Sequence, residues 1–359
     1  MLHNNNVYHF FMSACTPKGF VTNFLDLTDE TEYKNVFILK GGPGSGKSTL
    51  IKKAATHLGA DGICELIHCS ADVQSLDAAI FEKQALTFID GTSPHTIEPS
   101  LPGFCHKVVS LYDFFSDKIL STYTAEIRRA ALKEEMYRQR FESFIRAAGM
   151  LLSSNENLAS RCIEREKLSN YVSRLCAREI KKTKSGIGAL RIRYLSTLSE
   201  DGVFMFTDTA HKLCERLFAI DDDSGAASGI ILEGFCNAAL AAGYTVYCCP
   251  CPMSDNGKID HLFIPELSLG FMTSNKFHPI IGDGIKTIHT SRFFDREKMR
   301  EYTFRSSFQR RAARELLKEA ALFGTKRLEC HRRVENYYVQ ACDFNRRDAY
   351  FDDILKGIK

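Results

Sequence analysis

The chain lacks an uninterrupted apolar run long enough to cross a membrane. Its most apolar stretch, residues 229–251, contains Glu233 and Asn237 and is broken at Gly243, which is typical of a buried helix followed by a strand. The first residues, MLHNNNVYHFF, carry no basic leader, which argues against a signal peptide. We therefore expect a soluble, cytoplasmic protein with no membrane partner.

The 13 cysteines lack the regular spacing of a small secreted disulfide domain. They are scattered through apolar segments, as reduced and buried thiols would be. Cys248 and Cys251 have a C-x-x-C spacing, but no second such pair exists, and His261 is the only convenient further ligand for zinc. We predict that these cysteines are structural thiols.

The 359 residues, of which 44% are hydrophobic and 25% charged, suffice for two globular domains. Two segments resemble each other, LDAAIFEKQALTFID at 76–90 and IDHLFIPELSLGFMT at 259–273. Flanking segments match in the same order, at offsets of 179 to 183 residues. This pattern indicates a tandem repeat with one domain at 1–185 and a second at 186–359.

Each half shows the same alternation of apolar strands and helices. A strand runs into a glycine-containing loop and a helix, followed by a second strand, a helix opened near Asp72 or Asp255, and a third strand. Such alternation predicts an α/β fold in which a parallel sheet is covered by helices. Each core is followed by a basic segment that we expect to form a helical hairpin, the first turning at 153–157.

The strongest motif follows the first strand. Gly41, Gly46, Lys47 and Ser48 fill the pattern G-x-x-x-x-G-K-[ST] of a P-loop between a strand and a helix. Glycines let the backbone turn its N–H groups toward phosphates, and the helix N-terminus adds a positive dipole end. The predicted nucleotide-binding residues are Gly41, Gly42, Pro43, Gly44, Ser45, Gly46, Lys47, Ser48 and Thr49.

The triphosphate also needs a magnesium ion. Lys47 would place a cation on the β- and γ-phosphates, and the Ser48 hydroxyl would be a Mg²⁺ ligand. Asp90 ends the apolar strand that precedes it, a position that suits a carboxylate reaching hydrated Mg²⁺, although Asp90-Gly91 is also a common turn pair. No glutamate follows Asp90, so the catalytic base stays open.

The matching loop of the second half has lost these features. In the sequence alignment Ser228 stands at the Lys47 position and Thr273 at the Asp90 position. Three consecutive aspartates, residues 221–223, put negative charge where the triphosphate would lie. We therefore expect a pseudo-domain that binds no triphosphate.

The repeat also sorts the remaining polar residues. Asp72 and Asp77 recur in the second half, which favours helix capping over catalysis for both. His95 follows Asp90 closely and has no counterpart in the sequence alignment, so it could sense the γ-phosphate or position water as a catalytic residue. The alternative is a solvated loop histidine.

The basic segments leave several partners open. Arg128-Arg129, Arg310-Arg311 and Arg332-Arg333 could bind nucleic acid or another polyanion, or they could form solvated helical faces. An arginine such as Arg310 or Arg311 could also reach the first site and stabilise the γ-phosphate.

The runs VFILKGGPGSGKSTLIKK, HCSADVQSLDAAI and ALTFIDGTSPH together resemble a family of Firmicutes-type ATPase-like proteins with two tandem P-loop NTPase halves. The resemblance covers nearly the whole chain and implies nucleotide binding, without a particular substrate. In that family both halves often carry an intact P-loop, and this chain departs by losing the second.

The sequence thus favours a magnesium-dependent ATP-binding protein, either an ATP hydrolase or a nucleotide-driven switch. The guanine-recognition pattern N-K-x-D is absent, because Asn275-Lys276 continues differently, which favours ATP over GTP. One alternative is a P-loop kinase that phosphorylates a small molecule under a basic lid. Another is a nucleic-acid-binding protein that uses ATP as a conformational ligand.

Overall fold

The computed structural model describes residues 6–59, 62–181, 186, 188–199 and 202–358. The chain forms two compact units, which are described separately. Unit 1 comprises Met1–Ser13, Thr22–Phe141 and Ala321–Lys359, and unit 2 comprises Ala14–Val21 and Glu142–Ala320. Each unit therefore takes residues from both halves of the sequence. The boundary that we predicted at residue 185 lies outside the described residues.

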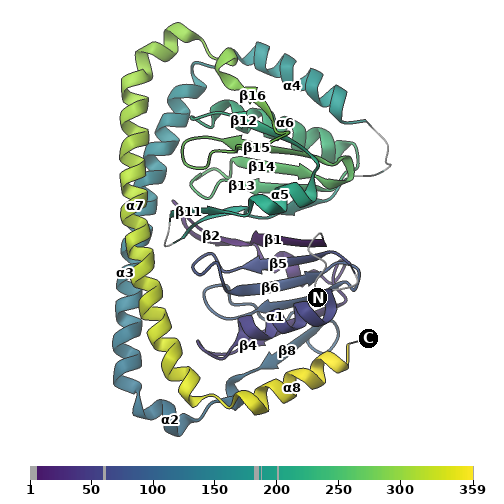
Figure 1. The fold of residues 1–359 in the computed structure, drawn as a ribbon, viewed down its shortest axis with the longest axis vertical. Coiled ribbons are helices and arrows are strands. Elements are labelled where there is room, and N and C mark those ends of the chain that lie inside the picture. Colours follow the sequence, from purple (N-terminus) through teal and green to yellow (C-terminus); the bar gives the residue numbers. More distant parts are fainter. Residues whose placement is uncertain (1–5, 60–61, 182–185, 187, 200–201, 359) are drawn as a thin grey trace. The chain divides into compact units, whose positions relative to one another are not determined.

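Unit 1 is built on a six-stranded sheet in the order β1-β5-β6-β7-β4-β8 (Figure 1). Only β6 runs antiparallel to its neighbours, and the other three pairs are parallel. The strands are β1 (Val7–Phe11), β4 (Asn35–Lys40), β5 (Cys64–His68), β6 (Leu76–Phe81), β7 (Leu86–Asp90) and β8 (His106–Ser110).

Unit 2 contains a second six-stranded sheet in the corresponding order, β9-β13-β14-β15-β12-β16. Here β14 is the strand that runs antiparallel to its neighbours. The strands are β9 (Leu190–Ile192), β12 (Arg216–Asp221), β13 (Val246–Pro250), β14 (Ile259–Ile264), β15 (Leu269–Ser274) and β16 (Lys286–His289). The two sheets thus share one topology, as an internal repeat requires.

The helix predicted near Asp72 or Asp255 is wrong, because β6 and β14 occupy those segments. All six residues of β6 are buried, since an interior strand with both faces covered needs apolar side chains throughout. A tight turn, in which the Ala85 backbone N–H donates to the Glu82 carbonyl at 3.1 Å, reverses the chain into β7. The sheets are consequently mixed, whereas we predicted wholly parallel ones.

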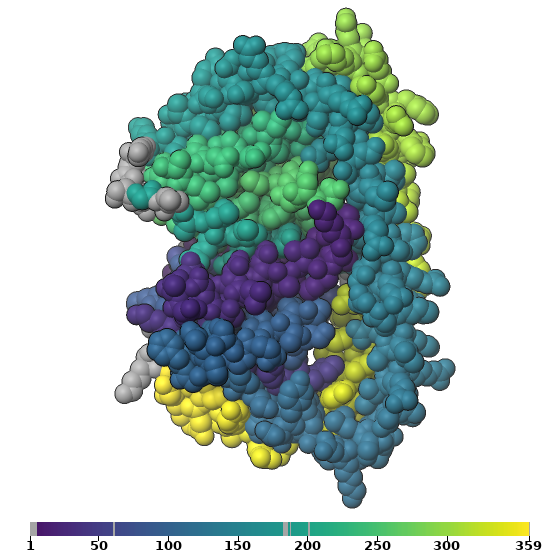
Figure 2. Space-filling view, turned by 180° about the vertical axis from the view of Figure 1, so that it is seen from behind, coloured from purple at the N-terminus to yellow at the C-terminus, as the bar shows by residue number. Residues whose placement is uncertain are grey.

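Each sheet is covered by one helix from its own half and one from the other half of the sequence. In unit 1, α1 (Lys47–Leu58) follows β4, and α8 (Phe344–Lys356) from the C-terminal end buries Phe351 against Phe88 at a ring distance of 5.7 Å. Figure 2 shows the yellow C-terminal helix lying against purple and blue residues. In unit 2, α6 (Ala226–Ala241) follows β12, and α4 (Arg165–Glu179) packs on it.

Two long helices, α3 (Thr124–Ser160) and α7 (Arg296–Ala341), contribute to both units. The hairpin turn predicted at 153–157 is wrong, because α3 continues through it. The polar residues there bind α7, with Gln309 Nε2 donating to Ser154 Oγ at 2.7 Å and Ser306 Oγ to Asn155 Oδ1 at 2.6 Å. These polar side chains therefore stabilise the pairing of α3 with α7, and they do not end α3.

The remaining elements are short. They are α2 (Asp117–Thr122), α5 (Thr207–Leu213) and two hairpins, β2 (Ser13–Thr16) with β3 (Gly19–Thr22) and β10 (Ser196–Ser199) with β11 (Gly202–Met205). Within the described residues no helix is both long and apolar enough to traverse a bilayer.

Candidate nucleotide site and its counterpart

The predicted P-loop joins β4 to α1 at the carboxyl end of the unit 1 sheet. α1 begins at Lys47, directly after Gly46, which has a positive φ of 79°. A Cβ at Gly46 would also lie 2.0 Å from the Nη1 atom of Arg347. The left-handed backbone therefore favours glycine here, and a larger residue would also displace the Arg347 guanidinium.

The Lys47 ammonium lies back against the loop. Its Nζ donates to the carbonyl oxygens of Gly41 at 2.9 Å and Gly42 at 3.2 Å, and it lies 3.6 Å from Asp90 Oδ2. Ser48 Oγ accepts a hydrogen bond of 2.8 Å from the backbone N–H of Leu76, which begins β6. The first turn of α1 is thus attached to β6 as well as to β7.

That attachment brings together an acidic cluster. One ligand atom each from Asp77, Asp90 and His95 lies within 4.8 Å of the others. Asp77 Oδ2 is 3.8 Å from His95 Nε2, and both side chains are less than 10% exposed. Asp90 Oδ1 accepts hydrogen bonds from the backbone and the hydroxyl of Thr92, so the turn role considered for Asp90 is also present.

Burial shifts the pKa values of two members of this cluster in opposite directions, because it favours the uncharged form of each side chain. It raises the pKa of Asp77 well above its usual range, and the Asp90 carboxylate raises it further. It lowers the pKa of His95, against a smaller opposing effect of Asp90. At neutral pH the His95 ring is therefore uncharged, and Asp77 holds a proton more readily than an ordinary aspartate.

Two sequence interpretations need correction here. Asp77 is no helix cap, because it lies in β6 and faces the cluster, whereas Asp72 accepts from Ser75 Oγ at 2.7 Å in the turn before β6. His95 is no solvated loop residue, because it is 6% exposed and stacks on Phe24 at a ring distance of 4.4 Å. Sequence reasoning missed Asp77 since the strand containing it was taken for a helix.

A second missed residue is Arg347 of α8. Its Nη1 donates to the Ser45 carbonyl oxygen at 2.8 Å, and its Nε donates to Asp348 Oδ1 at 2.9 Å. The helical periodicity of the sequence could have revealed it, because Arg347 lies on the same buried i, i+4, i+8 face as Phe351 and Leu355. An arginine on an otherwise apolar face indicates a specific partner, here the phosphate-binding loop.

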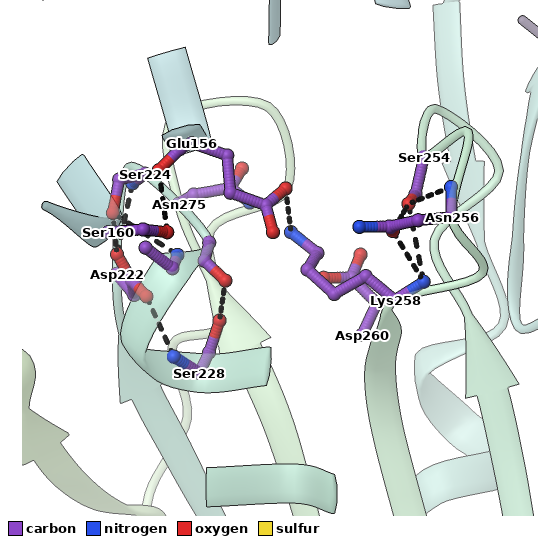
Figure 3. A network of polar contacts seen from close by, with 12 residues as sticks. Glu156, Ser160, Asp222, Ser224, Ser228, Ser254, Asn256, Lys258, Asp260 and Asn275 are labelled. Atoms are coloured by element: carbon purple, nitrogen blue, oxygen red, sulfur yellow. Dashed lines mark hydrogen bonds and ion pairs between the residues drawn. The ribbon is translucent and has the colours of Figure 1, made fainter. Parts of the chain in front are cut away.

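The corresponding loop of unit 2 carries an internal anion. The Asp222 carboxylate accepts hydrogen bonds from the backbone N–H groups of Ser224, Ala227 and Ser228 at 3.0, 2.9 and 2.8 Å (Figure 3). It also accepts one from the Ser224 hydroxyl at 2.6 Å. These N–H groups include the first turn of α6, where a helix binds anions. A protein carboxylate therefore occupies the donors that a phosphate would need.

The structure also changes the alignment of the two loops. α6 begins at Ala226 after Gly225, whose φ of 78° matches that of Gly46. Ala226, and not Ser228 as predicted, therefore stands at the Lys47 position. A cation is nevertheless present, because Lys258 Nζ would lie 2.0 Å from a Cβ at Gly225.

Lys258 is engaged within unit 2. Its Nζ lies 3.8 Å from Glu156 Oε2 (Figure 3). Burial lowers the pKa of Lys258, but the neighbouring Cys251, Asp260 and Glu156 groups outweigh this and raise it overall. The ammonium therefore stays charged and balances local carboxylates.

Arg310 and the cysteines also have local partners. Arg310 Nη1 donates to Asp223 Oδ2 at 2.6 Å within unit 2, which differs from the role over the γ-phosphate that we considered for it. The cysteines are free thiols, and burial raises the pKa of Cys251 to about 12, as expected for a structural thiol.

Comparisons of the chain with protein-family models, with curated proteins and with solved structures found no match.

Proposed function

We propose that unit 1 binds ATP with Mg²⁺ at residues 41–49 and hydrolyses it, while the loop of unit 2 holds no triphosphate. The observation that carries this proposal is the convergence of Lys47, Ser48 and Asp90 at the N-terminus of α1, behind a glycine loop. A cation, a hydroxyl and a carboxylate are the groups that a magnesium triphosphate needs there.

The donor set suits magnesium. Mg²⁺ prefers oxygen ligands and keeps several waters, so the Ser48 hydroxyl and the Asp90 carboxylate would hold it together with phosphate oxygens. When bound, the ion would neutralise charge on the β- and γ-phosphates. Lys47 would exchange its present carbonyl partners, Gly41 and Gly42, for phosphate oxygens, which are better partners because the hydrogen bonds are charge-assisted on both sides.

Asp77 is the residue best placed to act as a general base. It neighbours Asp90 within the acidic cluster, and its raised pKa makes it more basic than an ordinary carboxylate. His95 packs beside this carboxylate, with its Nε2 atom 3.8 Å from Asp77 Oδ2. This assignment fills the role that the missing glutamate after Asp90 left open.

The test compares two lysines beside equivalent loops. In Lys47→Met the affinity for Mg-ATP should fall by about 3 kcal/mol, or about 100-fold in Kd, because a buried charge pair is lost. Lys258→Met is the matched control and should bind ATP like wild type. Calorimetric titration measures both, and phosphate release without an added acceptor measures hydrolysis. Unchanged ATP affinity in Lys47→Met would show that the proposal is wrong.

A further inference from the structure

Four positions around the acidic cluster of unit 1 have counterparts in unit 2, each 183 residues later in the chain. The pairs are Asp77 with Asp260, Ala78 with His261, Asp90 with Thr273, and His95 with His278. His95 thus has a counterpart that the sequence alignment did not reveal. Unit 2 has exchanged one carboxylate for an imidazole, so an oxygen-rich cluster has become a nitrogen-rich one.

The three unit 2 side chains converge. One ligand atom each from Asp260, His261 and His278 lies within 4.8 Å of the others. Asp260 Oδ2 is 3.1 Å from His278 Nε2 and 3.9 Å from His261 Nε2. Ligand atoms about 2.1 Å from a metal ion lie about 3.0 to 3.4 Å apart in octahedral or tetrahedral geometry, so only small shifts are needed.

Several polar atoms of this cluster point to a missing partner. Among the described residues, both ring nitrogens of His261 and the Nδ1 atom of His278 have no hydrogen-bond partner, while the Oδ2 atom of Asp260 has the His278 Nε2 atom 3.1 Å away. The side chains of His261 and Asp260 are 1% and 2% exposed, so bulk water cannot form hydrogen bonds with their buried polar atoms. Leaving buried polar atoms unpaired is costly, and native proteins seldom do so without a bound group.

The charges around the cluster leave room for a cation. The nearby Lys258 ammonium opposes a second cation, but Glu156 lies 3.8 Å from it and partly neutralises it.

We propose that Asp260, His261 and His278 bind a divalent transition-metal ion, with zinc the simplest occupant. Two imidazoles and one carboxylate suit zinc, cobalt or ferrous iron, whereas Mg²⁺ prefers an all-oxygen set. Three protein ligands leave coordination positions open. Asp260 and His278 line a cavity of about 80 Å³, which has room for water or a small ligand atom to complete the shell. This site is independent of the proposed ATP site.

Cobalt provides the test, because bound Co²⁺ shows d–d absorption that reports its ligands. The full chain is treated with a chelator and titrated with Co²⁺, and one ion per chain should give a visible band. His261→Gln and His278→Gln should each weaken Co²⁺ binding by more than about 100-fold, since even outer-shell changes cost 10- to 100-fold. Zn²⁺ should displace Co²⁺, and it should raise the Tm of wild type but not of either histidine variant.

The controls assign the band to unit 2. Asp77→Asn alters the counterpart cluster, and Lys47→Met weakens only the proposed ATP binding, so both should retain the Co²⁺ band. If His261→Gln fails to fold, His278→Gln still decides the question, because its side chain is 10% exposed and tolerates change better. No band in wild type, a band unchanged in both histidine variants, or its loss in Asp77→Asn would overturn the proposal.

Discussion

Asp222 should stabilise unit 2 by acting as an internal anion at the start of α6. Its carboxylate accepts from three backbone N–H groups and one hydroxyl, and two of those donors, the N–H groups of Ala227 and Ser228, are buried. Asp222→Ala removes a helix cap, worth about 1 kcal/mol, and leaves buried donors unpaired at about 1–3 kcal/mol. We expect a total loss of about 2–4 kcal/mol in the free energy of unfolding of unit 2.

The assay follows from the chemistry of the loop. Hydrogen exchange measured by mass spectrometry should show faster exchange across residues 226–241 in Asp222→Ala, and circular dichroism should show a lower unfolding midpoint. Inorganic phosphate should restore stability to this variant more than it changes wild type, because it can occupy the freed N–H groups. Asp222→Asn keeps the oxygen acceptor but not the charge and should lie between the two. If Asp222→Ala unfolds like wild type and does not respond to phosphate, the internal-anion account is wrong.

Four further outcomes are expected. Asp77→Asn should keep ATP affinity but lower turnover by about 100-fold or more, and it should abolish the rise of rate with pH that a general base produces. Folding raises the pKa of Asp77, so the stability that this carboxyl contributes is present at low pH and is lost as the pH rises through the raised pKa. Asp77→Asn should therefore raise the Tm more at pH 7 than at pH 4. Arg347→Met should cost about 1.5–3 kcal/mol and speed hydrogen exchange in residues 41–46, because the charged hydrogen bond to the Ser45 carbonyl is lost; an unchanged Tm would contradict this. Calorimetry should give one ATP per chain, and a stoichiometry near two would refute the account of the unit 2 loop.

The elements that could be predicted from sequence are those whose conformation is determined by residues close together in the chain. The strand before Gly41, the helix from Lys47 and the glycine at the left-handed position lie within a dozen residues, so pattern and backbone chemistry suffice to locate them. The internal repeat was also visible, and the shared strand order of the two sheets agrees with it. The strand β6 was misread because an apolar run of six residues is compatible with either a buried helix or a buried strand.

By itself, then, the sequence determined the repeat, the α/β class and the position of the loop that we propose binds ATP. The tertiary structure alone decided which helix covers which sheet, and with it the meeting of Arg347 and Ser45, which are 302 residues apart. It also decided that Asp77 faces Asp90 and that Asp222 binds the N-terminus of α6. An amphipathic pattern indicates that a helix needs an apolar surface to cover. Both six-stranded sheets offer such a surface, and only the packing of the whole fold selects between them.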